Sequence, residues 1–289
     1  MDPKVKEAVL EAQQYGAELL GNWGPLLNVF VRYGEPDLEY IASQECLYRS
    51  KYSDDDYDSC YEYNYWWYRT FDDCCGAFHG TPVALAPVRF QSMQYNGPEK
   101  QYETIRKDTL HEYIHVWQSA FKVYPHETRC SDEANKLCEL GNGPLWLEEG
   151  SAEYFAVYFA EKKAWSNLRS VLTEKLNSAH DVYDKWGFTL KNSHNRGAKD
   201  KLDQHECNCG GAIMYDMGIW GIAWLAHKSK SNDGFLKEFY PRVAYIGYQQ
   251  AFENAFGLTL DEFYNEFALW FDQTPKSEKL KIIDVISKY

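Results

Sequence analysis

The spacing of hydrophobic and polar residues divides the chain into a few short extended runs and many helical segments. Residues 3–20 show helical periodicity and end at Gly21. Residues 26–33 and 82–90 are short, strongly apolar runs, which predicts two strands. After residue 98, apolar residues recur at helical spacing almost to the end of the sequence.

Together these elements predict an α+β fold in a single unit, residues 1–289. A small strand-bearing N-terminal lobe would comprise residues 1–97, and a mainly helical lobe residues 98–289. The segment 44–80, between the predicted strands, is rich in Tyr, Trp, Asp and Cys and is expected to be irregular.

One predicted helix carries a pair of histidines. Residues 109–121 contain no Gly or Pro, and residues 111–115 read H-E-Y-I-H. His111 and His115 are four residues apart and therefore project from the same helix face. Two imidazoles at this spacing can bind one Zn²⁺, and Glu112 between them would face a metal-bound water. The alternative is a surface helix that carries two histidines by chance.

A second segment offers a third ligand. A catalytic zinc site needs three protein ligands and one open position. Residues 146–155 begin another predicted helix after a Gly-Asn-Gly-Pro turn, and they contain Glu148, Glu149 and Glu153. A carboxylate from this segment would complete the set, and the alternative is a solvated acidic helix face.

At this point the chain resembles the gluzincin metallopeptidases, in which H-E-x-x-H is joined by a downstream Glu. Residues 146–154 match the W-L-x-E-G-x-A-x-Y motif of the aminopeptidase-like branch. The resemblance makes Glu149 the third zinc ligand and leaves Glu148 at a variable, solvated position. It implies that Glu153 accepts a hydrogen bond from the free ring nitrogen of a zinc-bound His. It also implies a zincin-like fold with the active site in the cleft between the two lobes.

Two further segments extend the resemblance to about residues 105–273. Tyr215 and Gly218 match a Y-x-x-G motif whose Tyr hydroxyl donates a hydrogen bond to the oxyanion. A core tyrosine at a helix start is the alternative for Tyr215. Residues 251–263 match an A-F-x-x-A-F-G closing pattern, which supports the family without implying chemistry.

The resemblance implies a hydrolase that holds one Zn²⁺ per chain and hydrolyses peptide bonds with a metal-activated water, with Glu112 as general base. The chain departs from the best-known branches by its long spacer of 33 residues between His115 and Glu149. It also lacks the G-A-M-E-N-type motif that grips a free amino terminus, so we expect an endopeptidase more than an aminopeptidase. The alternatives are an inactive secreted binding protein on a zinc peptidase scaffold, and an enzyme that acts on a non-peptide bond.

Charge and composition limit the partners. The net charge is −13 and the pI is near 5.1, which disfavours a nucleic-acid partner, because phosphate binding needs basic patches. No run of 18 apolar residues occurs, so no membrane span is expected. The expected partner is a peptide or protein substrate.

The eight cysteines indicate an oxidising compartment. They lie at positions 46, 60, 74, 75, 130, 138, 207 and 209, and their even number suggests four disulfides in a secreted, extracellular protein. Cys130 and Cys138 would close a small loop, whereas Cys74 and Cys75 would pair with different partners. Zinc binding by the C-x-C pair at 207 and 209 is a weaker rival interpretation. No signal peptide is visible, so a cytosolic protein with free thiols is the alternative.

Overall fold

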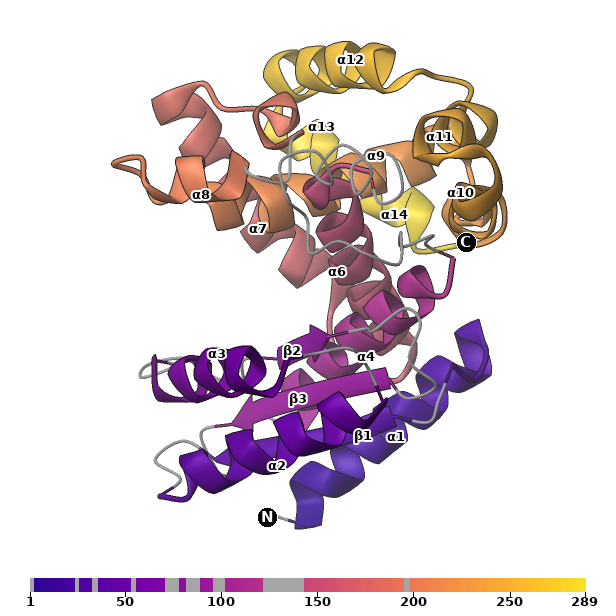
Figure 1. Cartoon of the computed structure of the whole chain (residues 1–289). Helices are drawn as coiled ribbons and strands as arrows, with labels where there is room; N and C mark the ends of the chain where they lie inside the picture. Colours follow the sequence, from indigo (N-terminus) through magenta and orange to yellow (C-terminus); the bar gives the residue numbers. More distant parts are fainter. Residues whose placement is uncertain are drawn as a thin grey trace. The chain divides into compact units, whose positions relative to one another are not determined.

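The chain divides after Ala120 into two compact units, Met1–Ala120 and Phe121–Tyr289 (Figure 1). The computed structural model describes residues 3–23, 26–32, 36–52, 56–70, 78–81, 89–95, 102–121, 143–194 and 198–289. The helix with the two histidines therefore belongs to the first unit, whereas the sequence alone suggests a boundary at residue 97.

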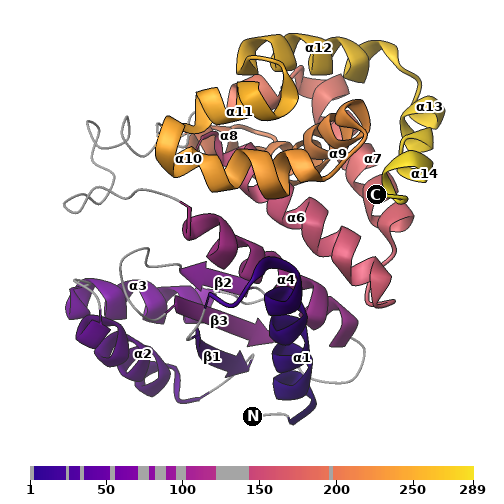
Figure 2. The same ribbon diagram turned by 90° about the vertical axis from the view of Figure 1, so that its right-hand side faces the viewer.

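The first unit is built around a small sheet. Its strands are β1 (Leu26–Arg32), β2 (Phe78–Thr81) and β3 (Arg89–Tyr95), in the order β1-β3-β2 (Figure 2). β1 and β3 are parallel over their whole length, and β2 pairs with β3 in the antiparallel sense. A parallel pair needs a long crossover connection, which the helical segment between β1 and β3 provides.

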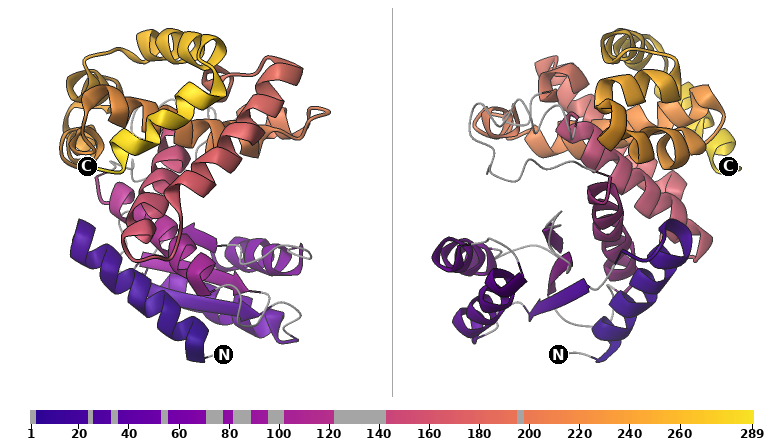
Figure 3. Two further views of the ribbon diagram at one scale, coloured as in Figure 1. Left: turned by 180° about the vertical axis from the view of Figure 1, so that it is seen from behind. Right: turned by 45° about the vertical axis from the view of Figure 1, so that its right-hand side comes forward.

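Four helices cover the two faces of this sheet. They are α1 (Pro3–Leu20), α2 (Leu38–Tyr52), α3 (Tyr57–Thr70) and α4 (Tyr102–Ser119). α1 and α4 lie on one face and α2 and α3 on the other (Figure 2 and Figure 3). Side chains alternate between the two faces of β1, which explains the two helix layers. On one face Val31 packs against Ala42 of α2 and Tyr68 of α3. Asn28 accepts a 2.6 Å hydrogen bond from Gln13 of α1.

A close helix contact fixes α4 against α1. A Cβ atom on Gly16 of α1 would lie 2.6 Å from the ring of Tyr113, so only glycine fits there without a shift. The Tyr113 hydroxyl donates a 2.7 Å hydrogen bond to the Gly21 carbonyl, and burial raises the pKa of this hydroxyl. At the other end of the contact, Arg106 pairs with Glu11 at 2.7 Å.

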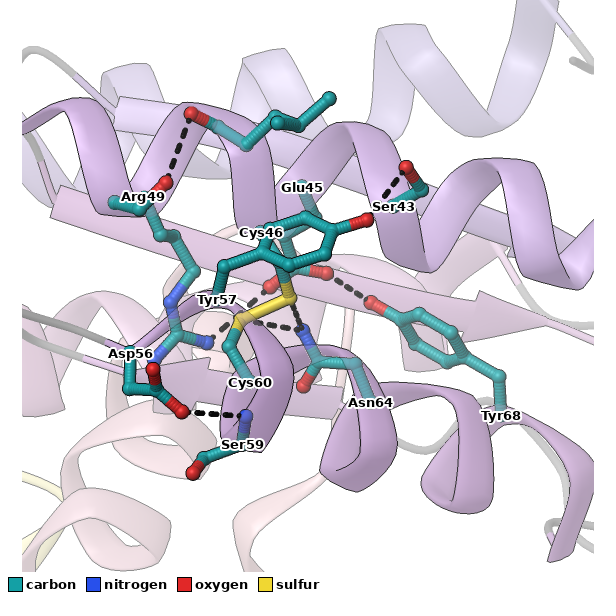
Figure 4. The surroundings of a disulfide bond; sticks show 12 residues. Ser43, Glu45, Cys46, Arg49, Asp56, Tyr57, Ser59, Cys60, Asn64 and Tyr68 are labelled. Atoms are coloured by element: carbon teal, nitrogen blue, oxygen red, sulfur yellow. Dashed lines mark hydrogen bonds and ion pairs between the residues drawn. A yellow bond between two sulfur atoms is a disulfide. The ribbon is translucent and has the colours of Figure 1, made fainter.

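The Cys46–Cys60 disulfide joins α2 to α3 (Figure 4). Beside it, the buried Glu45 carboxylate accepts hydrogen bonds from Arg49, at 3.5 Å, and from the Tyr68 hydroxyl. The two cysteines and the residues of this network, Glu45, Arg49 and Tyr68, are all buried. A buried carboxylate is stable only when it is paired in this way, so the network and the disulfide together hold the helix pair.

The second unit is helical throughout its described residues. Its elements are α6 (Leu145–Lys162), α7 (Leu168–Trp186), η1 (Leu190–Ser193), α8 (Ala198–Asp203), η2 (Ala212–Met217), α9 (Gly218–Ser229), η3 (Gly234–Phe239), α10 (Tyr240–Ile246), α11 (Tyr248–Phe256), α12 (Leu260–Gln273), α13 (Lys276–Lys281) and α14 (Ile283–Ile286). α6 runs beside α9 (Figure 1), and every residue of α6 from Gly150 to Ala160 is buried. These two helices form the centre of this unit, because a helix that is apolar on all sides must be covered on all sides.

Two helix boundaries in this unit are set by local sequence signals. α11 ends at Gly257, which adopts a left-handed conformation with φ of 68°. α12 then begins with a capping box, in which Thr259 and Glu262 bond each other's backbone N–H groups.

The predicted α+β fold class is wrong, because the chain is mainly α-helical. Most of the described residues lie in helices, and strands are confined to the short β1, β2 and β3. The segment 44–80 accounts for much of the difference, since it contributes to α2 and α3 instead of being irregular. Its tyrosines recur at helical spacing, and Tyr57, Tyr61 and Tyr65 stack along α3 with ring centroids 6.1 and 5.8 Å apart.

Most of the predicted strand at 82–90 lies outside the described part of the chain, and its last two residues, Arg89 and Phe90, begin β3. Of the eight cysteines, the structure describes four, which form the Cys46–Cys60 and Cys207–Cys209 disulfides. The bonded pair at 207 and 209 offers no free thiolate to a zinc ion. The predicted loop closed by Cys130 and Cys138 lies outside the described residues, as do Cys74 and Cys75.

Candidate metal centre

The two histidines of the H-E-x-x-H motif lie in the C-terminal half of α4. Their side chains are buried, with exposed fractions of 8% for His111 and 9% for His115. The two rings meet edge to face, and their Nε2 atoms are 3.0 Å apart. The predicted placement of both histidines on one helix face is therefore confirmed.

The separation of the two nitrogens fits a shared metal ion. Two nitrogens that each lie about 2.0–2.1 Å from one tetrahedral zinc ion are about 3.3 Å apart. The observed 3.0 Å is close to this value. Without a metal, the same distance requires one ring to donate an N–H to the other.

A neighbouring glutamine defines the tautomer of His115. Nδ1 of this ring lies 2.7 Å from Oε1 of Gln118, one helical turn further along α4. In this orientation of the Gln118 amide the oxygen accepts, so Nδ1 carries the proton. In the neutral ring the lone pair is then on Nε2, which is the atom that faces His111. Gln118 was not predicted as part of the site, although its i, i+3 spacing from His115 could have indicated the contact.

The acidic residues lie at the expected positions in their own helices. Glu112 is buried within α4, with an exposed fraction of 7%. In α6, Glu148 and Glu149 are half-buried and Glu153 is buried. Glu153 is therefore not part of a solvated acidic face, whereas Glu148 and Glu149 remain partly exposed.

Within the described part of the chain, His111, His115 and Glu149 form a group that can hold a metal ion. One potential ligand atom from each residue lies within 4.8 Å of the other two. Two imidazoles and one carboxylate make a donor set that suits a zinc ion with one open position. The residues thus fit the metal that the sequence predicts.

A contact between two glycines sets the helix crossing beside Glu149. A Cβ atom on Gly150 would lie 2.6 Å from the carbonyl carbon of Gly218, and one on Gly218 would lie 3.0 Å from the Trp146 carbonyl oxygen. The glycines of the W-L-x-E-G and Y-x-x-G motifs are thus required by the packing of α6 against η2 and α9. This packing holds the backbones of the Glu149 and Tyr215 segments together in the second unit.

Tyr215 is half-buried in η2, a single π-helical turn. Such turns occur frequently at functional sites. The next residue, Asp216, anchors the turn to α7 through Lys175 at 2.7 Å and Ser178 at 2.6 Å. The backbone around Tyr215 is therefore held on two sides, by α6 and by α7.

Two other residues of the W-L-x-E-G-x-A-x-Y motif have structural roles. The Trp146 indole N–H donates a 2.9 Å hydrogen bond to the Tyr264 hydroxyl, and the ring stacks on Phe263. The Tyr154 hydroxyl donates to Asn232 at 3.1 Å, and burial strongly raises the pKa of this hydroxyl. Both side chains fix α6 in the core instead of contributing to the metal centre.

Comparison with known proteins identifies no relative. No protein-family model matches the chain, and neither a curated protein nor a solved structure matches it significantly. Among the described helices, none is both long and apolar enough to cross a lipid bilayer.

Proposed function

We propose that the protein is a zinc-dependent peptidase of the gluzincin type. The observation that carries the proposal is the convergence of the His111 and His115 Nε2 atoms to 3.0 Å on one face of α4. The grouping of Glu149 with these atoms supports it, because two imidazoles and a carboxylate are a donor set of catalytic zinc sites. The predicted motifs around Glu112 and Tyr215 add the groups that hydrolysis requires.

Each group has a distinct task in this proposal. A metal ion held by His111, His115 and Glu149 would lower the pKa of a bound water molecule and would polarise the scissile carbonyl. The Glu112 carboxylate takes a proton from the attacking water and passes it to the leaving amine. The Tyr215 hydroxyl donates a hydrogen bond to the oxygen that becomes negative as the water attacks.

Glu153 has a supporting task. Because Gln118 already accepts from Nδ1 of His115, the ring nitrogen proposed to bind Glu153 is Nδ1 of His111. A carboxylate in that position would fix the second tautomer and make the ligand more basic.

We also propose that the enzyme is an endopeptidase of an oxidising, extracytoplasmic compartment. The absence of a G-A-M-E-N-type motif from the sequence supports internal cleavage. The Cys46–Cys60 disulfide supports the compartment, because such bonds are rare in reducing cytosol.

A digest of a diverse peptide library tests the function. The zinc-loaded protein should cleave within peptides, chelation should stop the cleavage, and added Zn²⁺ should restore it. Cleavage confined to the terminal residue would make the enzyme an exopeptidase. A folded, zinc-loaded protein that cleaves no peptide would contradict the proposal and favour an inactive binding protein.

A further inference from the structure

We propose that Gln118 is a positioning residue that prepares His115 to bind the metal. This inference rests on the proposed zinc centre, because it concerns how one of its ligands is held. The Gln118 amide oxygen lies 2.7 Å from Nδ1 of His115, and the glutamine side chain is completely buried. No motif in the sequence assigns a role to this residue.

The first effect of the contact is on the tautomer. A neutral imidazole carries its proton on either nitrogen, and only the form protonated at Nδ1 offers the Nε2 lone pair. A fixed acceptor at Nδ1 selects this form before the metal arrives. Zinc binding then does not have to displace the other tautomer.

The second effect is on orientation. A histidine ring in an open position rotates freely about its last side-chain bond. Here the ring is held by Gln118 at one nitrogen and meets the His111 ring edge to face at the other end. An acceptor on the second nitrogen both orients the ring and makes the ligand more basic, and such partners typically contribute 10–100-fold in metal affinity.

The burial of Gln118 strengthens the inference. A completely buried amide is costly unless its polar atoms are paired. An apolar residue at this position would avoid that cost, as Trp117 and Val116 do on the same helix. The glutamine is therefore best explained by the acceptor that it supplies to His115.

The test compares two substitutions in the full-length protein. Gln118→Met keeps the size and removes the acceptor, whereas Gln118→Glu keeps an acceptor at the same length. Zinc affinity, measured by competition with a chelating dye, should fall about 10–100-fold in Gln118→Met. It should stay at or above the parent value in Gln118→Glu. Ser119→Ala is the matched control, because Ser119 bonds the backbone carbonyl of His115 and not its ring.

A purely structural glutamine predicts the reverse order. Methionine would then be tolerated with unchanged zinc affinity, and the buried charge of glutamate would lower both the melting temperature and the affinity. That result would overturn the inference and leave the zinc centre intact. If Gln118→Met fails to fold, Gln118→Glu decides alone, and an affinity more than tenfold below the parent value overturns the inference. A parent protein that binds no zinc would instead contradict the proposed function itself.

Discussion

The two helices that carry the candidate metal ligands are held in different ways. In α4, the histidines and Gln118 interact within one helix, so their geometry follows from spacing along the chain. In α6, the segment around Glu149 depends on a backbone contact with Gly218, 68 residues away from Gly150 in the sequence. The histidine pair is therefore a local structure, whereas the position of the carboxylate is a product of tertiary packing.

The largest expected effect concerns Glu112, which lies on the locally organised helix. Glu112→Gln keeps the size of the side chain but cannot take a proton, so peptide hydrolysis should fall by about 10²–10⁴-fold. Zinc content should not change, because Glu112 is not a proposed ligand. Steady-state kinetics together with elemental analysis measures both quantities. Full activity in this variant would remove Glu112 from the mechanism.

Substitution of Tyr215, which lies in the segment that packs against α6, should have the next largest effect on activity. Tyr215→Phe removes only the hydroxyl, so kcat should fall by about 10²–10³-fold while KM changes by less than about threefold. The alternative, a core tyrosine, predicts a lower melting temperature with a nearly normal kcat. Kinetics beside a melting curve separates the two, and an unchanged kcat would exclude Tyr215 from the site.

The contact between Gly150 and Gly218 tests whether α6 depends on tertiary packing, as α4 does not for its histidine pair. In Gly150→Ala the new methyl group would lie 2.6 Å from the Gly218 carbonyl carbon, so the backbone must shift. Overpacking of this kind should lower the free energy of unfolding by about 1–3 kcal/mol. Gly211→Ala is the control, because its methyl group meets no atom within 4 Å and its φ of −60° suits alanine. Denaturant titration that finds equal stability for both variants would contradict the tight crossing.

The smallest expected effect is a pH dependence that arises from packing in the second unit. Lys279 of α13 is buried and contacts His180 of α7 at 3.0 Å. Burial, and then the nearby Lys276, lower the pKa of Lys279 from 10.5 to about 8, although Asp184 and Asp272 act in the opposite direction. Between these two pH values the unfolded chain binds more protons than the folded protein.

The free energy of unfolding should therefore rise as the pH increases from about 8 to 10.5, and this contribution should be constant below pH 8. Lys279→Met removes the titrating group and should remove the rise. Denaturant titrations of the parent and the variant across this range measure the difference. Identical pH profiles would show that Lys279 titrates normally.

The part of the site that could be predicted from the sequence is the local part. The spacing of His111 and His115 within one helix was enough to place their rings together. Gln118 lies at an equally local spacing, but its role becomes visible only when the ring orientation is known. By contrast, the need for glycine at positions 150 and 218 could not be predicted. A sequence pattern does not show which helix backbones come into contact.

The same division explains the errors in the predicted fold. The helix with clear periodicity at residues 3–20 was predicted correctly and corresponds to α1. α3 and the second half of α2 were missed because the Tyr, Trp, Asp and Cys residues of segment 44–80 indicated an irregular structure, and the Tyr, Trp and Asp residues of α3 have low helix propensity. These helices are stabilised instead by long-range contacts: the Cys46–Cys60 disulfide, the buried Glu45 network and packing on β1.

The central claim is that Glu149 completes a zinc site with the two histidines, and neighbouring glutamates provide its most direct test. Glu148 and Glu149 are both half-buried in α6, but only Glu149 is grouped with the histidines. Elemental analysis after dialysis should find about one Zn²⁺ per chain in the parent and in Glu148→Ala, and almost none in Glu149→Ala or His111→Ala. Equal zinc content in Glu148→Ala and Glu149→Ala, or a parent protein without zinc, would contradict the account.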